Sequence, residues 1–252
     1  MITDPIFYLA AVPAVIMIGI AKGGFVAGLG VLAVPVIALV VPPNQAAAIL
    51  LPILCVMDLI GLWAYRGKWV WPELRILLPA SLLGIAVGTL IFGYMSPARL
   101  RLLLGILAIA FTLHHWLQAY LSKVTEQKHF GPAIGTAAAA LSGFTSFIAH
   151  AGGPPMAMYL LRRGLNRTQF VATTIVFFAV VNYVKLVPYT WLGQFDASNL
   201  KTSLVLAPLA PIGIGLGVWL HNIVTDRFFF RLAYSMLFVV GLKLIYDGVT
   251  GL

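Results

Sequence analysis

Charged residues are scarce in this sequence: only 9% of its 252 residues are Asp, Glu, Lys or Arg. Soluble globular domains carry about 25% charged residues. Apolar runs of roughly 20 residues, long enough to cross a bilayer, recur almost to the C-terminus and are joined by short segments. The sequence therefore predicts an all-α polytopic membrane protein and leaves no room for a separate soluble catalytic domain.

Cysteines, catalytic motifs and a signal peptide are also missing. Cys55 is the only cysteine, which excludes a disulfide framework and a soft-metal site. There is no HExxH, no GxSxG with triad partners, no P-loop and no Cys or His cluster with metal-ligand spacing. We therefore expect no enzyme, no metal, no cofactor and no nucleotide-driven pump. The N-terminus carries Asp4 instead of a basic region, so we expect no removable signal peptide.

The formal charge of +9 needs a different explanation from nucleic-acid binding. The sixteen Lys and Arg residues are spread through the loops and form no basic stripe with exposed aromatic residues, so no nucleic acid is expected as a partner. Orientation in a membrane by cytoplasmic Lys and Arg explains the excess. The expected location is a bacterial inner (plasma) membrane, multi-pass, with the lipid bilayer as a partner; a homodimer is compatible with the sequence.

Two stretches interrupt the apolar pattern. Residues 20–35 (IAKGGFVAGLGVLAVP) place one lysine, four glycines and a proline inside a run that could otherwise cross a membrane. Residues 150–155 (HAGGPP) form a second interruption about half a chain later. A charge is costly inside a membrane-spanning helix, and glycines weaken the helix. These stretches are therefore candidates for the functional site. They predict two broken or re-entrant helices within about 8–10 membrane segments.

The rest of the chain reads as apolar helices and tight turns. Asn44 follows two prolines and is expected to cap the next helix. Ser81, Gly84 and Gly88 have the spacing that aligns one helix face for close packing. The helices are expected at 5–21, 25–41, 46–65, 74–94, 96–117, 131–148, 156–161, 171–189, 200–220 and 228–246.

An internal duplication is indicated by matched glycines, prolines and turns. Placing Asn44 on Asn166 brings Gly30 onto Gly152, and short insertions bring Gly84 and Gly88 onto Gly213 and Gly217. The predicted units are an N-terminal repeat at 1–121, a connecting loop at 122–130 and a C-terminal repeat at 131–252. Chance matching in a chain rich in Gly and Pro is the alternative.

Loop charges favour inverted repeats with both termini outside. If each interrupted segment crosses the membrane twice, or enters and returns as a re-entrant hairpin, each half changes side an odd number of times and the halves are inverted. One face then carries eleven Lys and Arg residues and the other face four, as the positive-inside rule predicts. The first face holds Lys22, Arg66, Lys68, Arg75, Lys123, Lys128, Arg162, Arg163, Arg167, Arg227 and Arg231; the second holds Arg99, Arg101, Lys201 and Lys243, with Lys185 buried.

Polar groups at membrane depth are the candidate site residues, since such groups face the protein interior or a wet cavity. A half-helix beginning at Lys22 would point its positive dipole end at a bound anion, as would the break near Gly153. The expected anion contacts are Lys22, Gly23, Gly24, Thr145, Ser146, His150, Gly152, Gly153, Asn182 and Lys185. Asp58 is the candidate for proton coupling, because an acid in apolar surroundings is more easily protonated.

Structural alternatives exist for three of these residues. Lys22 can reach the membrane surface and act only as an anchor. Lys185 can be the ion-pair partner of Asp58. His150 can be a hydrogen-bonded packing residue. The sequence leaves these alternatives open.

Four segments resemble the TauE/SafE family of membrane permeases. They are KGGFVAGLG at 22–30, PPNQAAAILLP at 42–52, SGFTSFIAHAGGPPMAMYL at 142–160 and GLNRTQFVAT at 164–173. The resemblance implies transport of small anions such as sulfite, sulfoacetate and related sulfonates. Many members have GxGGG or GIGGG in the second half where this chain has AHAGGPP, so His150 occupies a place often taken by a small residue.

The combined interpretation is a secondary transporter that moves a small anion, a sulfur oxyanion or organosulfonate, by alternating access, with a proton as a candidate coupling ion. The alternatives are an anion channel, which needs an open hydrated path, and a membrane-embedded enzyme or assembly subunit.

Overall fold

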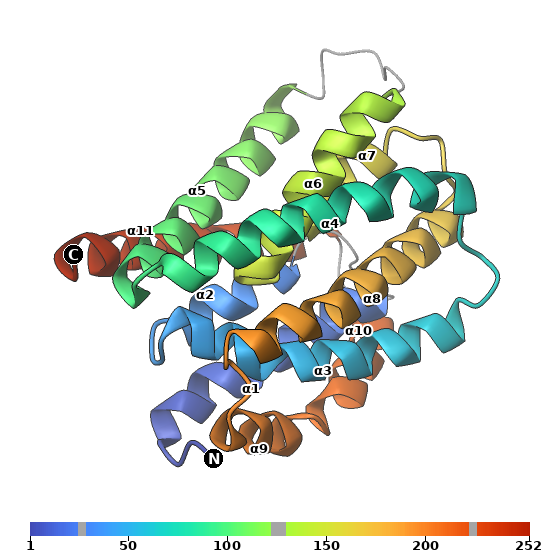
Figure 1. Cartoon of the computed structure of the whole chain (residues 1–252). Helices are drawn as coiled ribbons and strands as arrows, with labels where there is room; N and C mark the ends of the chain where they lie inside the picture. Colours follow the sequence, from blue (N-terminus) through green and yellow to red (C-terminus); the bar gives the residue numbers. More distant parts are fainter. Residues whose placement is uncertain (25–28, 122–129, 222–225) are drawn as a thin grey trace.

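The computed structural model describes residues 1–24, 29–121, 130–221 and 226–252, and all regular structure in these ranges is helical (Figure 1). The elements in chain order are α1 Pro5–Gly24, η1 Leu29–Leu32 (a 3-10 helix), α2 Ala33–Ile37, α3 Pro43–Ala64, α4 Trp71–Tyr94, α5 Pro97–Leu121, α6 Pro132–Ala149, α7 Gly153–Leu160, α8 Arg167–Trp191, α9 Ala197–Leu206, α10 Leu209–His221 and α11 Asp226–Thr250.

Eight spans in the described ranges are long and apolar enough to cross a membrane, and α9 and α10 together form one of them. The predicted all-α polytopic architecture is therefore confirmed, and its number of spans lies within the predicted range. The short helices α2 and α7 bury most of their residues inside the bundle.

Both termini lie at one end of the bundle, on the left in Figure 1. The backbone N–H of Ile2 donates to Thr202 Oγ1 at 3.1 Å, and Asn44 Nδ2 donates to Gln194 Oε1 at 3.1 Å. These contacts bring the N-terminus, the turn before α3 and the start of α9 together. We call this end, made of residues 1–5, 38–45 and 192–202, the terminal end.

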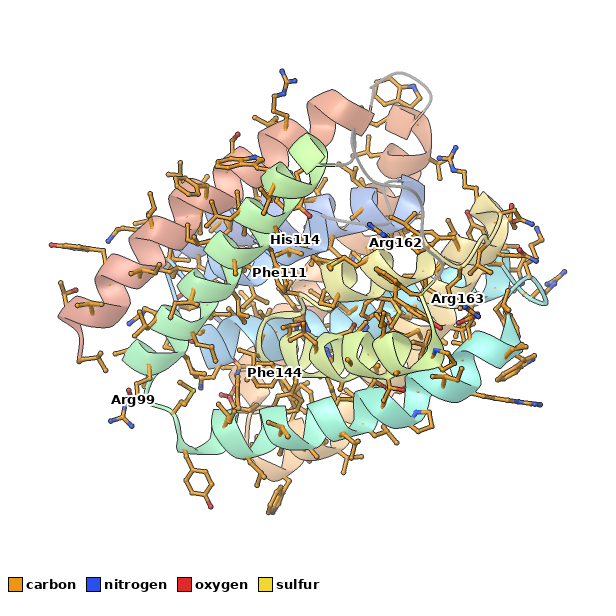
Figure 2. All side chains as sticks on the ribbon, turned by 90° about the horizontal axis from the view of Figure 1, so that it is seen from above. Arg99, Phe111, His114, Phe144, Arg162 and Arg163 are labelled. Atoms are coloured by element: carbon orange, nitrogen blue, oxygen red, sulfur yellow. The ribbon has the colours of Figure 1, made fainter. Side chains whose placement is uncertain are left out.

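The opposite end carries the α3–α4 and α7–α8 loops. The backbone N–H of Val70 donates to Thr173 Oγ1 at 3.0 Å, and Arg163 Nη1 donates to the Phe130 carbonyl at 2.9 Å. Figure 2 shows Arg162 and Arg163 on the opposite side of the molecule from Arg99. We call this end, made of residues 65–73, 130–132 and 161–169, the basic end.

Helix pairs join the two halves of the chain reciprocally. α1 packs along α10 and α4 packs along α6, while α3 packs on α8 and α5 on α11. A Cβ atom at Gly84 would lie 1.9 Å from the Ala140 carbonyl oxygen, and one at Gly213, its match in the second half, would lie 3.0 Å from that of Ile16. The expectation of close packing at Gly84 is confirmed. Matched glycines serve matched helix contacts, which is in line with a duplication.

The first break differs from the sequence expectation. α1 continues through Lys22 to Gly24, so the prediction of a half-helix beginning at Lys22 is wrong. A lysine in the last turn of a helix is favoured by the negative C-terminal end of the helix dipole. Gly23 allows close packing instead of breaking the helix, because a Cβ there would lie 2.3 Å from the Ile214 carbonyl oxygen.

Two boundaries also differ. The predicted cap at Asn44 is wrong: α3 begins one residue earlier, at Pro43, which fits the first helical position because its missing N–H has no partner there. The expected helix at 200–220 is two helices, since Pro208 cannot donate a backbone hydrogen bond and α9 ends at Leu206.

Candidate functional site

The second break is built by hydroxyl groups that satisfy its backbone. α6 ends at Ala149, the next residue, His150, has a left-handed φ of 51°, and α7 begins at Gly153. Ser142 Oγ donates to the Gly152 carbonyl at 2.7 Å, and Thr145 Oγ1 lies 3.2 Å from the Ala151 carbonyl oxygen. These hydroxyl groups thereby provide hydrogen-bond partners for backbone carbonyl groups that the interrupted helix leaves without one. Thr145 and Gly152 therefore shape the break.

His150 links this break to two other helices. Its Nε2 lies 2.9 Å from the Ala47 carbonyl oxygen on α3, and its Nδ1 lies 2.9 Å from Lys185 Nζ on α8. Because a lysine ammonium only donates, Nδ1 accepts, and Nε2 therefore carries the hydrogen that is donated to Ala47. Both ring nitrogens are used within the protein, so the expected packing role of His150 has a geometric basis.

Lys185 lies in α8 with 0% of its surface exposed. Its Nζ donates to the Ser146 carbonyl at 2.9 Å, to Ser146 Oγ at 3.0 Å and to His150 Nδ1. All three acceptors are neutral. In the described ranges no carboxylate forms an ion pair with Lys185. A buried charge without a counter-charge is unfavourable, so this position is suited to a nearby anion.

The partner of Asp58 is Lys22. Lys22 Nζ forms an ion pair with Asp58 Oδ1, and Asn182 Nδ2 donates to Asp58 Oδ2 at 2.6 Å. The Asp58 side chain is 0% exposed and the Lys22 side chain 21%. The alternative that pairs Lys185 with Asp58 is therefore wrong, and so is the alternative that Lys22 only anchors at the membrane surface, because its ammonium points into the bundle.

A cavity of about 90 Å³ lies between α1, the two breaks and α8. We call it the central cavity. Five residues expected at the site line it: Lys22, Ser146, His150, Gly153 and Asn182. The remaining lining is Ile18, Ala21, Gly30, Val31, Leu54, Thr174, Ile175 and Phe178. The lining thus contains one cationic residue and several polar ones, and the rest of it is mostly apolar.

Both breaks contribute a glycine to this cavity. A Cβ atom at Gly30 or at Gly153 would meet no atom within 4 Å, so each glycine faces open space. The other expected site residues do not line the central cavity: Gly23, Thr145, Gly152, Lys185 and Asp58. Gly24 is the last residue of α1 before the undescribed segment 25–28.

A second cavity, of about 350 Å³, leads toward the basic end. We call it the vestibule. Asp58, Tyr65 and Lys68 line it, together with Gly23, Met57, Ile60, Gly61, Ala64, Ile214 and Val218. Lys22 and Ile175 line both cavities. The pair of Lys22 with Asp58 therefore stands between the central cavity and the vestibule.

Sequence reasoning missed Thr174 and Phe178. They precede Asn182 at steps of four residues, which places all three on one face of α8. That spacing was the available signal. Gly30 had a signal too, because the duplication places it on Gly152.

A sequence model described as Sulfite exporter TauE/SafE matches residues 11–244, which include every residue that lines the central cavity. The chain belongs to the TauE/SafE family. The resemblance found in the sequence is confirmed. The family name describes exporters, in agreement with the expectation that the chain is not an enzyme.

One TauE/SafE relative is a probable sulfite/organosulfonate exporter TauE of Cupriavidus necator, 24% identical over 169 residues. The match covers 66% of this chain, and the chain spans 64% of the relative's length. No solved structure matches the chain.

Proposed function

We propose that the protein is a secondary transporter that moves a small anion, a sulfur oxyanion or organosulfonate such as sulfite or sulfoacetate, across the bacterial inner membrane. The observation that carries the proposal is a central cavity lined by Lys22, with the buried Lys185 hydrogen-bonded to Ser146 and His150 of its lining. The exporter named above supports the same substrate class.

The charge of the site supports an anion. Lys22 and Lys185 contribute two positive charges and Asp58 one negative charge, while His150 accepts at Nδ1 and is neutral. With Lys185 protonated the site carries a net positive charge, and one bound anion neutralises it and favours that protonated form. In low-dielectric surroundings such compensation is worth several kcal/mol.

Hydrogen-bond donors at the cavity wall support an oxyanion. Ser146 Oγ accepts from Lys185 and donates to no described residue, so its own hydrogen is available to the cavity. Gly153 occupies the first position of α7, where a backbone N–H has no intrahelical partner. Pro154 and Pro155 have no N–H, so Gly153 provides the only such donor among the first three residues of α7.

The volume of the central cavity favours a small substrate. One water needs roughly 10–15 Å³ of such space, so about 90 Å³ holds roughly six to nine water-sized atoms. Sulfite is smaller than this limit, and sulfoacetate is close to it. Larger organic anions require an enlarged cavity.

Alternating access is the proposed mechanism, on the basis of two inverted repeats. The reciprocal packing of α1 with α10 and of α4 with α6 supports the repeats. The vestibule reaches the basic end, which the positive-inside rule places in the cytoplasm. Toward the terminal end, Tyr189 donates to the Phe147 carbonyl at 2.7 Å and packs against Phe92 and Phe195. This aromatic layer, in which Tyr189 also stacks on His150 of the cavity lining, is the proposed closure on that side.

Proton coupling through Asp58 is part of the proposal. Asp58 is buried and reaches both the Lys22 ammonium and the vestibule. A proton from the vestibule would neutralise the carboxylate and free Lys22.

Uptake into proteoliposomes tests the function. The panel is sulfite, sulfate, sulfoacetate, thiosulfate and simple carboxylates, each with and without a pH gradient. We expect saturable uptake of a sulfur anion and accelerated exchange when the same anion is present inside. Flux without saturation or counterflow would indicate a channel, and the absence of flux for the whole panel would refute the proposed substrate class.

A further inference from the structure

Asp58 reaches the central cavity's polar groups from outside that cavity. Its Oδ1 binds Lys22 and its Oδ2 accepts from Asn182 at 2.6 Å. Both partners line the central cavity, whereas Asp58 lines only the vestibule. The Asp58 carboxylate therefore binds the Lys22 ammonium and the Asn182 amide, two groups that would otherwise be available to a bound anion.

These two donors suit the substrate as well as they suit Asp58. An ammonium and an amide N–H that hold two oxygens of a carboxylate can equally hold two oxygens of a sulfite or sulfonate group, because both are oxygen acceptors with a negative charge. Such charge-assisted hydrogen bonds are about twice as strong as neutral ones. Two anions cannot share Lys22 and Asn182 without repulsion.

We propose that Asp58 is a built-in competitor of the transported anion: it occupies Lys22 and Asn182 in the empty protein, and the arriving anion displaces it toward the vestibule. This inference rests on the proposed function and adds the atoms by which the anion is recognised. Lys22 and Asn182 are the direct contacts, and Lys185 acts from behind Ser146 and His150.

Displacement links the anion to a proton. A carboxylate with 0% exposure that loses both partners is an unpaired buried charge, which is strongly unfavourable. A proton taken from water in the vestibule removes that charge, so one proton accompanies one anion. The titratable and charged groups around Asp58 are Lys22 on α1, Cys55 on α3, Tyr183 and Lys185 on α8, His150 after α6, and Tyr65 and Lys68 at the vestibule.

A purely structural ion pair makes the opposite prediction. If Asp58 served only to neutralise Lys22, its replacement would leave Lys22 unpaired, destabilise the bundle and leave anion binding unchanged or weaker. If Asp58 competes with the anion, its removal strengthens binding. The two roles are therefore distinguished by the direction of a single change in affinity.

The test is equilibrium binding of sulfoacetate to purified protein by calorimetry at about pH 6 and about pH 8, where a sulfonate stays ionised. The variant Asp58→Asn keeps the size of the side chain and removes its charge. The matched control is Asp247→Asn, which removes a carboxylate that pairs with Lys243 on α11, near the C-terminus. Thermal unfolding of each variant verifies that it is folded.

We expect Asp58→Asn to bind sulfoacetate about tenfold more tightly or better at pH 8, equivalent to ~1.4 kcal/mol. Wild type and Asp247→Asn should bind more tightly at pH 6 than at pH 8, and Asp58→Asn should lose this dependence. If the wild type binds but folded Asp58→Asn binds no tighter, the competition is refuted while the proposed function stands. If neither binds any anion of the panel, the proposed function fails with it.

Discussion

Replacing Lys185 by methionine tests how a buried ammonium acts on the central cavity. Methionine has a similar length and no donor. The Ser146 carbonyl keeps a hydrogen bond, because the His150 backbone N–H also donates to it at 3.1 Å. His150 Nδ1 loses its one donor among the described residues, which costs about 1–3 kcal/mol for a buried acceptor. Removal of an uncompensated charge offsets part of this cost.

The expected effect on the anion is larger. The Lys185 ammonium lies behind Ser146, so two hydrogen bonds in series place it up to roughly 6 Å from a bound anion. At an effective dielectric constant of about 20, a charge at that distance contributes about 3 kcal/mol. Lys185→Met should therefore weaken anion binding ~100-fold.

The assay is the binding of sulfoacetate by calorimetry, combined with thermal unfolding in detergent. Lys243→Met is the matched control, since Lys243 is exposed and paired with Asp247 far from the cavity. It should bind as the wild type does. A folded Lys185→Met protein with wild-type affinity would refute the idea that Lys185 provides the charge behind the site.

Two further predictions concern stability. Gly84→Ala should lower the free energy of unfolding by about 1–3 kcal/mol, because its Cβ would meet a backbone carbonyl on α6 at 1.9 Å; Gly215→Ala, where the Cβ meets nothing within 4 Å, should be neutral or stabilise by up to about 1 kcal/mol. Equal Tm values for the two variants would contradict the packing argument. Arg163→Gln should lower the free energy of unfolding by about 2 kcal/mol, because the buried Glu73 loses the hydrogen bond that Arg163 Nε donates at 2.8 Å. The partial exposure of the arginine keeps the loss from being larger. The hydrogen bond to Glu73 raises the pKa of Arg163, so this contribution is fully present below the ordinary arginine pKa and is lost only as pH rises through the raised value. The loss of unfolding free energy in Arg163→Gln should therefore be equal at neutral and mildly alkaline pH. A loss that disappears in that range would contradict the proposed role of the Arg163–Glu73 pair.

The sequence predicted the membrane helices and the second break because their signals are local. Apolar length marks the spans, and the glycines around 152–153 mark the end of α6. The polar residues at membrane depth also gather as expected, since Lys22, His150 and Asn182 all line one cavity. Few polar groups occur in the spans, so few combinations were available.

The partners within the site could not be predicted from the sequence. Either Lys22 or Lys185 could have paired with Asp58. Which of them does so depends on how α1 and α8 approach α3, and no local sequence pattern specifies that. The place of Lys22 was mispredicted for a related reason. It was expected at the positive N-terminal end of a half-helix but lies in the last turn of α1, because Gly23 does not break the helix and instead serves close packing against α10. Glycine allows both, and only the neighbouring helix distinguishes them.

The most direct test of the account is exchange of labelled sulfoacetate across proteoliposomes that contain Lys22→Met. Lys68→Met, at the mouth of the vestibule, is the control for a general loss of positive charge. The double variant Lys22→Met with Asp58→Asn avoids an unpaired buried carboxylate and so tests the site in a folded protein. The account predicts that both Lys22 variants lose exchange by about 50-fold or more, equivalent to ~2.3 kcal/mol, while Lys68→Met keeps most of it. Exchange at the wild-type rate in the folded double variant would contradict it.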